Sequence, residues 1–535
     1  MALSYPVGSV RAALEWPVPV ALQKVPRPEE PVVIATVPSA TLLGVEGQSV
    51  SVEVHVSQGL PGFNVVGLPD AACRESRDRV RAALLSSGLP WPLRRVTVNL
   101  APTSVRKGGA GLDLPIAVGL LVAAGELPAE SIAGSAYLGE LGLDGSVRRV
   151  AGMVPMVEAL DSPAVVVPSD CSAEAALIGR HRIRVAATLG ALVACLRGEA
   201  PWPDCPAPQP APPVPMGPDL ADVRGQHVGR TALEVCAAGG HHLLLCGPPG
   251  SGKTMLAVRL PRLLPVLDRD DALAATRVHS AAGRLASGDG LVVRPPLRAP
   301  HHGVSSVALI GGGSALMRPG EISLAHGGVL FLDELGEFPA SVLDALRQPL
   351  EEGVVRVSRA KASTTYPARF LLVGATNPCP CGEGGPRGSC RCSDGARARY
   401  HRRLSGPLLD RFDLRVVVGR PDAAALLGGP PGETTADVAQ RVAAVRELAR
   451  ERGVRTNAEI PAEQLDAVAP LSPAAAALLE YRLRTGSLSA RGLHRVRRVA
   501  RTVADLAGAP PLIGEEHVSL ALGLRAEVVA SEVAA

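Results

Sequence analysis

Apolar and polar residues alternate differently in successive parts of the chain. In the first third, Ser49–Val56 alternates residue by residue, as a half-buried strand does, and Val96–Leu100 is a short apolar run typical of a strand. Asp113–Ala124 has the length and pattern of a helix, and Gly142–Gly145 has the composition of a turn. These elements predict a mixed α/β domain.

Apolar strands and helices take turns in the middle of the chain. Strands are predicted at Leu243–Cys246, Gly328–Leu332, Phe370–Gly374 and Leu414–Val418, and a helix at Lys253–Leu264. Strands separated by helices form parallel sheets that helices cover on both faces. The middle region therefore predicts an α/β core built on a parallel sheet.

The last hundred residues have a helical pattern. In the clearest case, apolar residues recur on one helix face while arginines lie elsewhere. The apolar positions are Leu493, Val496, Ala500, Val503 and Ala507, and the arginines are Arg495, Arg498 and Arg501. A small helical domain is therefore expected to close the chain.

Proline and glycine mark the boundaries between these regions. Nine of the eighteen residues from Pro201 to Pro218 are proline, which excludes a helix or a central strand there, and a second break falls at Gly429–Gly432. We therefore expect a disordered leader over residues 1–35, an α/β domain over 36–200, a linker over 201–218, a parallel-sheet core over 219–425 and a helical lid over 426–535.

Composition and charge limit the functional classes. Basic residues exceed acidic ones by only four, so any contact with nucleic acid must be a local patch. No apolar run reaches the ~20 residues that a bilayer requires, and the first 35 residues lack an uninterrupted apolar segment between a basic start and a small-residue cleavage site. We therefore expect a cytoplasmic protein without a membrane partner. The ten cysteines in so long a chain do not indicate a disulfide scaffold.

A phosphate-binding loop lies between the strand at Leu243–Cys246 and the helix that follows. It consists of Gly247, Pro248, Pro249, Gly250, Ser251, Gly252, Lys253 and Thr254. Its glycines let backbone N–H groups face phosphate oxygens, while Lys253 is expected to reach the β- and γ-phosphates and Thr254 to bind Mg²⁺. The alternative, a turn that binds nothing, does not explain the whole motif in this setting. ATP and Mg²⁺ are therefore the predicted cofactors.

Further candidate catalytic residues follow two later strands. Asp333 and Glu334 end the strand after Gly328, where Asp333 is expected to hold Mg²⁺ and Glu334 to orient and deprotonate the attacking water. An acidic helix cap is the alternative interpretation of this pair. Asn377 follows the strand at Phe370–Gly374, and its amide could position water against the γ-phosphate or belong to a plain turn.

Two arginines, Arg411 and Arg491, are candidates for contact with phosphate. Arg411 lies beside a short strand and Arg491 at the start of a helix. From the residues alone, surface salt bridges are the favoured interpretation of both.

Together these segments resemble the ComM/YifB family of magnesium-chelatase-like AAA+ ATPases, from about Thr36 to the C-terminus. The segments that carry the resemblance are Gly62–Asp70, Gly320–His326 and Asn377–Gly382. It implies that Asn377 is sensor 1, Arg411 an arginine finger that reaches into the neighbouring subunit and Arg491 the sensor-2 arginine. It also implies a homohexameric ring that acts on single-stranded or branched DNA, as a branch-migration helicase that helps imported DNA recombine during natural transformation.

The resemblance leaves other functions open. One is a chelatase-type motor that remodels a protein partner, against which the first domain and the cysteine cluster argue; another is an ATP-switched assembly module without DNA activity. Residues 36–200 resemble the Lon-protease catalytic fold, which is like domain 2 of ribosomal protein S5. Gly111 stands where that fold has its serine, and Val154 near its lysine, so we expect no peptidase activity. Lys107 belongs to basic loops that favour a solvated face, with a DNA contact or packing against a neighbouring subunit as alternatives.

Two clusters in the middle region suggest further binding. Four cysteines in a Gly- and Pro-rich loop suit tetrahedral zinc, although reduced thiols or a redox-sensitive pair remain open. They are Cys379, Cys381, Cys390 and Cys392. The segment Arg294–Pro319 is expected to be an insertion of the kind that lines the pore in related rings, and packing is the alternative role for its histidines. Its tentative DNA contacts are Arg298, His301, His302 and Arg318.

Overall fold

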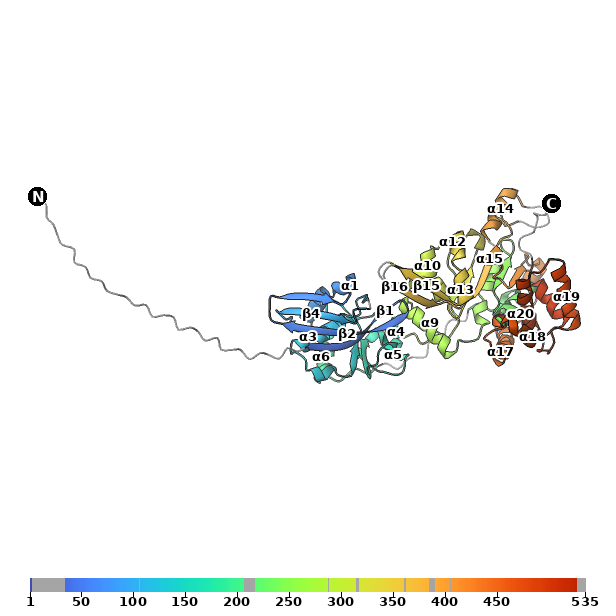
Figure 1. Ribbon diagram of the computed structural model, residues 1–535. Coiled ribbons are helices and arrows are strands. Elements are labelled where there is room, and N and C mark those ends of the chain that lie inside the picture. Colours follow the sequence, from blue (N-terminus) through green and yellow to red (C-terminus); the bar gives the residue numbers. More distant parts are fainter. Residues whose placement is uncertain are drawn as a thin grey trace.

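The computed structural model describes Met1 and residues 34–526, except 105, 206–216, 287, 314–316, 360–361, 384–389 and 405. The molecule is elongated, with an N-terminal α/β domain at one end and the C-terminal helices at the other (Figure 1). Residues 2–33 of the expected leader and 206–216 of the expected linker lie outside the described residues. The first strand already begins at Ile34, because Ala35 points into the domain core.

The N-terminal domain is built on two sheets. The larger sheet has the order β1-β2-β4-β3, with β1 (Ile34–Leu43), β2 (Glu46–Ser57), β3 (Gly62–Val66) and β4 (Arg95–Ala101). The smaller sheet joins β5 (Ser135–Tyr137), β8 (Ala164–Pro168) and β9 (Arg182–Ala186), and a β6–β7 ribbon pairs Glu140–Leu141 with Val147–Arg148. Its helices are α1 (Ala71–Arg74), α2 (Ser76–Ser86), α3 (Asp113–Ala123), α4 (Met153–Glu158), α5 (Ser172–Ala176) and α6 (Leu189–Leu196). The expected mixed α/β domain is confirmed.

Helix α3 lies in the centre of this domain. Gly119 lies so close to the strands that a Cβ atom there would lie 2.8 Å from Val54 Cγ2, and Asp113 at the helix start pairs with Arg79 at 2.6 Å. Lys107 is fully buried and its ammonium group donates to the Pro102 carbonyl. The expectation that Lys107 lies on a solvated face or contacts DNA is therefore wrong, because the chain turns its ammonium group inward.

A five-stranded parallel sheet forms the centre of the next domain. Its order is β11-β14-β17-β10-β18, with β10 (Leu243–Cys246), β11 (Leu297–Arg298), β14 (Val329–Leu332), β17 (Leu371–Thr376) and β18 (Leu414–Val417). The predicted strands are thus confirmed. The predicted helix at Lys253–Leu264 is wrong in length: α8 spans Lys253–Ala257, because Pro261 has no N–H to continue the helical hydrogen bonds.

Helices and two ribbons surround this sheet. The helices are α7 (His227–Gly239), α9 (Arg269–Ala281), α10 (Ser306–Ile310), α11 (Glu321–Leu324), α12 (Ala340–Asp344), α13 (Arg347–Glu352), α14 (Asp394–Arg403), α15 (Gly406–Leu409) and α16 (Ala423–Gly428). The ribbons pair β12 (Gly311–Gly312) with β13 (Arg318–Pro319) and β15 (Val354–Arg359) with β16 (Ala362–Pro367).

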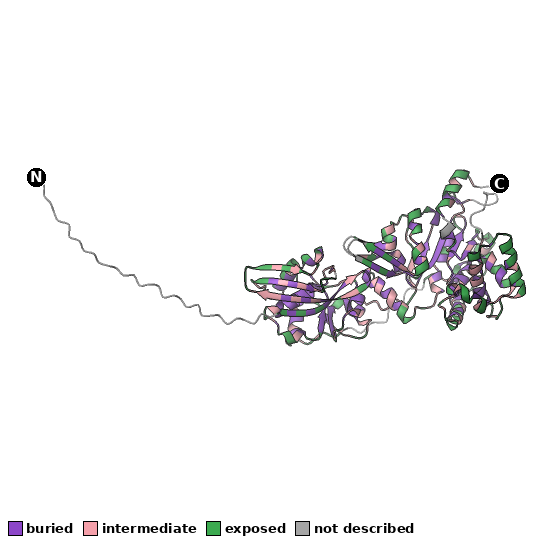
Figure 2. Ribbon diagram, in the orientation of Figure 1, coloured by how far each residue is buried: buried purple, intermediate pink, exposed green. Residues whose placement is uncertain are grey.

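The C-terminal region is helical, as expected. It contains α17 (Thr435–Glu451), α18 (Leu465–Val468), α19 (Pro473–Arg484), α20 (Ala490–Leu506) and α21 (Glu515–Gly523). Val496, Ala500 and Val503 of α20 are buried in one core shared with the parallel sheet. Figure 2 shows buried segments in both the sheet domain and the C-terminal helices. Arg501 is also buried, contrary to its expected position away from the packed face, because Asp505 pairs with it at 2.8 Å.

Polar contacts join the N-terminal domain to the parallel-sheet domain. The buried Glu174 accepts a hydrogen bond from Ser280 of α9 at 2.5 Å and an ion pair from Arg149 at 2.9 Å. Arg277 of α9 also pairs with Glu158. Among the described helices, none is long and apolar enough to cross a bilayer.

Candidate functional site

The phosphate-binding loop connects β10 to α8 at the carboxyl edge of the parallel sheet. Gly250 and Gly252 adopt positive φ angles of 76° and 85°, a backbone that favours glycine, and the space beside both is open. Lys253 Nζ donates to the carbonyl oxygens of Gly247 at 2.7 Å and Pro248 at 2.9 Å, and burial lowers the pKa of this lysine. The lysine ammonium and the backbone N–H groups at the helix start form a donor set that fits phosphate.

Oxygen ligands for Mg²⁺ lie beside this loop. The Thr254 hydroxyl donates to Asp333 Oδ2 at 2.7 Å, so residues 79 positions apart meet at the ends of α8 and β14. Hydroxyl and carboxylate oxygens are ligands that Mg²⁺ prefers. The residues present therefore fit the predicted nucleotide and metal.

Glu334 adopts a backbone conformation that is unusual for its residue type. Its φ of 51° lies in the left-handed region, where a non-glycine residue is strained by about 1–3 kcal/mol. Such strain often marks functional positions. The side chain is exposed, and its Oε2 lies 3.1 Å from His302 Nδ1. His302 is therefore positioned to orient the carboxylate predicted to act on water.

Asn377 follows β17 and faces the phosphate loop. Its Oδ1 accepts a hydrogen bond from Lys253 Nζ at 3.2 Å. The neighbouring Thr376 hydroxyl lies 3.1 Å from the hydroxyl of Tyr400, which comes from α14. The structure thus gathers Lys253, Thr254, Asp333 and Asn377 at one edge of the sheet, as a site for the phosphates requires.

Arg411 and Arg491 lie at the opposite edge of the same sheet. Both line a cavity of about 1100 Å³, together with residues that immediately precede strands or begin them, including His242, Gly328 and Leu371. Parallel strands present their amino ends at one edge and their carboxyl ends at the other. Within one chain, the two arginines therefore lie at the amino ends of the parallel strands and the phosphate loop lies at their carboxyl ends.

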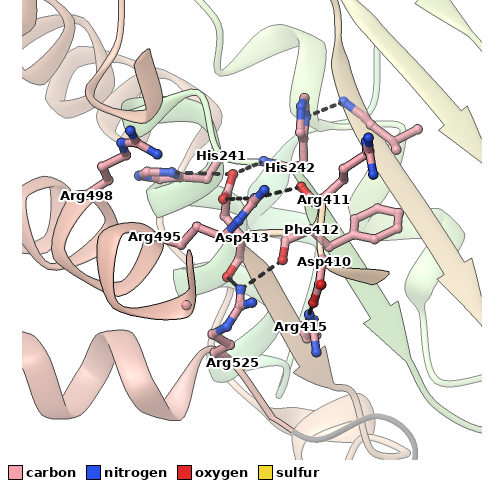
Figure 3. Close-up of polar contacts among 12 residues, drawn as sticks. His241, His242, Asp410, Arg411, Phe412, Asp413, Arg415, Arg495, Arg498 and Arg525 are labelled. Carbon is pink, nitrogen blue, oxygen red and sulfur yellow. Dashed lines mark hydrogen bonds and ion pairs between the residues drawn. The ribbon is translucent and has the colours of Figure 1, made fainter. Parts of the chain in front are cut away.

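The cavity wall is organised around Asp413 (Figure 3). Its Oδ1 pairs with Arg495 at 2.6 Å, its Oδ2 accepts from the His242 N–H at 3.2 Å, and its carbonyl accepts from Arg525 at 3.0 Å. Burial alone would raise the pKa of Asp413, but the neighbouring His241 and Arg495 hold it below its usual range. Arg411, two residues earlier, pairs with Glu351 of α13.

This anchoring joins the loop that carries Arg411 to the C-terminal helices. Sequence reasoning missed the roles of Arg495 and Arg525, because nothing local distinguishes them from surface arginines. The signal that the sequence offered was Asp413 directly before an apolar strand, because a carboxylate buried at that point needs a cationic partner.

The four clustered cysteines meet in the structure. One sulfur from each residue lies within 4.8 Å of the others, although residues 384–389 between the two pairs lie outside the described residues. A backbone hydrogen bond from Glu383 lowers the pKa of the Cys381 thiol to about 6.

The tentative DNA contacts occupy different environments. Arg298 pairs with Glu321 at 2.6 Å, His301 and His302 stack with ring centroids 3.9 Å apart, and Arg318 is exposed on the ribbon next to residues 314–316. Arg318 and His301 are exposed, whereas Arg298 and His302 are half-buried, and His302 also faces Glu334.

The fold and this site define a P-loop ATPase of the AAA+ class. A family model described as "Magnesium chelatase, subunit ChlI" matches residues 219–426, one described as "Subunit ChlI of Mg-chelatase" matches 52–170, and one for the ChlI C-terminal region matches 432–525.

Full-length relatives extend this result. An uncharacterized protein of Mycobacterium tuberculosis is 47% identical over 496 residues, which span 91% of this chain and 97% of that protein. YifB of Escherichia coli is 42% identical over 92% of this chain and 97% of its own length, and the competence protein ComM of Haemophilus influenzae is 41% identical over 92% and 98%. The chain therefore belongs to the ComM/YifB family of magnesium-chelatase-like AAA+ proteins.

A weaker likeness covers part of the chain. The probable DNA helicase MCM9 of Arabidopsis thaliana is 27% identical over 193 residues, which are 36% of this chain and 24% of that protein. The family model that matches residues 52–170 is itself described as a subunit of magnesium chelatase. The N-terminal domain is therefore no longer an argument against a chelatase-type motor. Membership of the AAA+ class supports ATP hydrolysis as the activity and an oligomer as the form in which the protein works.

Proposed function

We propose that the protein is an ATP-hydrolysing, homohexameric ring motor that acts on DNA in the cytoplasm, most specifically in branch migration during recombination of imported DNA. The proposal of a ring is supported by one observation: the predicted catalytic residues are divided between the two ends of the strands of one sheet. A single chain presents Lys253 and Glu334 at one edge and Arg411 and Arg491 at the other. Head-to-tail contact brings the arginines of one subunit to the phosphate loop of the next and closes a ring.

Each residue then has a chemical task. Lys253 and the loop N–H groups would hold the phosphates, and Thr254 and Asp333 would hold Mg²⁺, which would supply charge neutralisation at the phosphate oxygens. Glu334, oriented by His302, accepts a proton from water, while Asn377 fixes the position of that water. Arg411 leaves Glu351 and stabilises the negative charge of the transferred group from the neighbouring subunit.

DNA is supported as the substrate by the relatives and by one surface. ComM is named a competence protein and MCM9 a probable DNA helicase. The β12–β13 ribbon presents the exposed Arg318, and a ring of six copies would multiply this local charge into a phosphate-binding surface. The overall excess of four basic residues understates such a ring of charge.

A chelatase-type motor that remodels a protein partner is the second candidate. The family models described as ChlI subunits favour it, because they match all three domains. An ATP-switched assembly module is less well supported, because the complete set from Lys253 to Arg411 suits turnover.

The experiment that separates these functions is ATP hydrolysis by the purified full chain, with and without single-stranded and branched DNA. We expect DNA to raise the rate and Glu334→Gln to abolish it while ATP binding remains. An ATPase rate indifferent to DNA would favour a protein substrate, and a rate near zero with DNA present would favour the switch. Arg318→Ala should weaken DNA stimulation without changing the rate measured in the absence of DNA.

A further inference from the structure

Four cysteine sulfurs lie at separations that suit a single metal ion. Cys379 Sγ lies 3.2 Å from Cys381 Sγ and 3.6 Å from Cys390 Sγ, and Cys381 lies 3.7 Å from Cys390. Cys392 completes a group whose sulfurs all lie within 4.8 Å of one another. A zinc ion bonded to four sulfurs at ~2.3 Å holds neighbouring sulfurs ~3.8 Å apart. The three separations of 3.2, 3.6 and 3.7 Å lie below or close to this value, and all of the sulfurs lie within 4.8 Å of one another.

The same separations do not suit disulfides. A disulfide bond is ~2.05 Å long, whereas the shortest of these sulfur–sulfur separations is 3.2 Å. None of these four described residues forms a disulfide; Cys379 is buried, Cys390 and Cys392 are half-buried and Cys381 is exposed. Four thiols gathered around one point are typical of a structural metal site.

One side of the cluster is packed against the phosphate loop. The Gly382 N–H donates to the Cys379 carbonyl at 3.0 Å and closes a turn in which Gly382 has a φ of 80°. A Cβ atom on Gly382 would lie 2.5 Å from Pro249 Cδ of the phosphate loop, so only glycine fits between them. Asn377, two residues before Cys379, bonds to Lys253. The cluster is therefore connected to the nucleotide site by the packing of Gly382 against Pro249 and by the hydrogen bond between Asn377 and Lys253.

The other side of the cluster leads into α14. Cys392 precedes Ser393, whose hydroxyl accepts the Ala396 N–H at 3.3 Å and caps this helix. At the far end of α14, Arg403 donates to the Gly336 carbonyl at 3.0 Å, two residues after Glu334. Tyr400 of the same helix lies 3.1 Å from Thr376. The cluster thus lies between the phosphate loop and a helix that contacts the segment carrying Glu334.

We propose that Cys379, Cys381, Cys390 and Cys392 bind one Zn²⁺ ion, which holds the phosphate loop and α14 in the arrangement that binds and hydrolyses ATP. Four S–H bonds break, four protons are released and four Zn–S bonds form, with no change of oxidation state. Removing the ion frees both segments, so nucleotide affinity falls. The metal site itself does not depend on the proposed function, whereas its effect on hydrolysis rests on that function.

The metal site is tested on the purified full chain by elemental analysis. We expect about one zinc per chain in the wild type. The double variant Cys381→Ser/Cys392→Ser should lose the zinc, and Cys195→Ser in the N-terminal domain should retain it. Protein produced with cobalt should show the absorption bands of tetrahedral cobalt–thiolate, a readout that needs no variant to fold. The site would be overturned by wild-type protein that contains no zinc and in which the thiols of these four cysteines react freely, or that has a disulfide among them.

The link to nucleotide is tested by ATP binding, which requires no turnover. Zinc is removed with a thiol-compatible chelator, Mg²⁺ is restored, and binding of a fluorescent ATP analogue is measured before and after adding one equivalent of zinc. We expect affinity to fall by about tenfold or more and to recover with zinc. Unchanged affinity in zinc-free protein would overturn the link. Zinc-loaded protein that binds ATP but never hydrolyses it would contradict the proposed function and leave the metal site intact.

Discussion

The division of catalytic residues between two edges of one sheet predicts complementation between defective subunits. Lys253→Ala removes the phosphate contact at one edge, and Arg411→Ala removes the arginine at the other. Loss of a finger arginine costs ~10³-fold or more in hydrolysis rate, so each variant alone should be almost inactive. In an equimolar mixture, roughly one interface in four combines an intact Lys253 with an intact Arg411 from the neighbour. The mixture should therefore recover roughly a quarter of wild-type ATPase activity.

A second mixture tests Arg491 by the same logic. Because Arg411 and Arg491 line one cavity, both should act on the neighbour's nucleotide. Mixing Arg411→Ala with Arg491→Ala should then restore nothing, since every subunit lacks one of the two. The assay is steady-state phosphate release at a protein concentration where wild-type activity no longer depends on dilution. If ATPase activity does not recover when Lys253→Ala is mixed with Arg411→Ala, the reasoning is refuted. If activity recovers when Arg411→Ala is mixed with Arg491→Ala, Arg491 acts on the nucleotide of its own chain.

Three further predictions concern single positions. His326 is buried and its Nδ1 accepts the Arg369 N–H at 3.1 Å, and burial lowers its pKa from 6.5 to about 4. Because the unfolded chain binds the proton more readily, stability is fully present above pH 6.5 and falls toward pH 4, by about 2 kcal/mol between pH 7 and 5. Urea titrations should show this loss in the wild type and in the exposed control His227→Gln, but less of it in His326→Gln. Gly119→Val should destabilise the N-terminal domain by about 1–3 kcal/mol in thermal unfolding, whereas Gly190→Ala, whose Cβ meets nothing closer than 3.8 Å, should not. His302→Ala should lower the ATPase rate without weakening ATP binding, and an unchanged rate would remove its role beside Glu334.

The sequence predicted the carboxyl edge of the site well, because each element there leaves a local signal. The phosphate loop follows an apolar strand, and Asp333, Glu334 and Asn377 follow two others. The apolar pattern of these strands and the position of the polar residues after them are enough to predict this part of the site. The structure adds what no local pattern contains, such as the contact between His302 and Glu334 across 32 positions.

The opposite edge was harder to predict. Arg411 and Arg491 were identified from the family resemblance, since an arginine beside a strand or at a helix start is ordinarily a surface residue. Only the folded arrangement of the sheet and of α20 brings the two arginines to one cavity at the amino ends of the strands. Lys107 and Arg501 were misjudged for a different reason: their partners Pro102 and Asp505 are near in the sequence, but the packing that buries both side chains is not visible in a local pattern.

Strand movement is the most direct test of the account's central claim. The purified protein is incubated with ATP, Mg²⁺ and synthetic three- and four-stranded DNA junctions whose arms can exchange only by branch migration, with Glu334→Gln as the matched control. The account predicts ATP-dependent migration by the wild type and none by the variant, which should still bind ATP. Intact ATP hydrolysis with no migration on any junction would contradict a DNA motor.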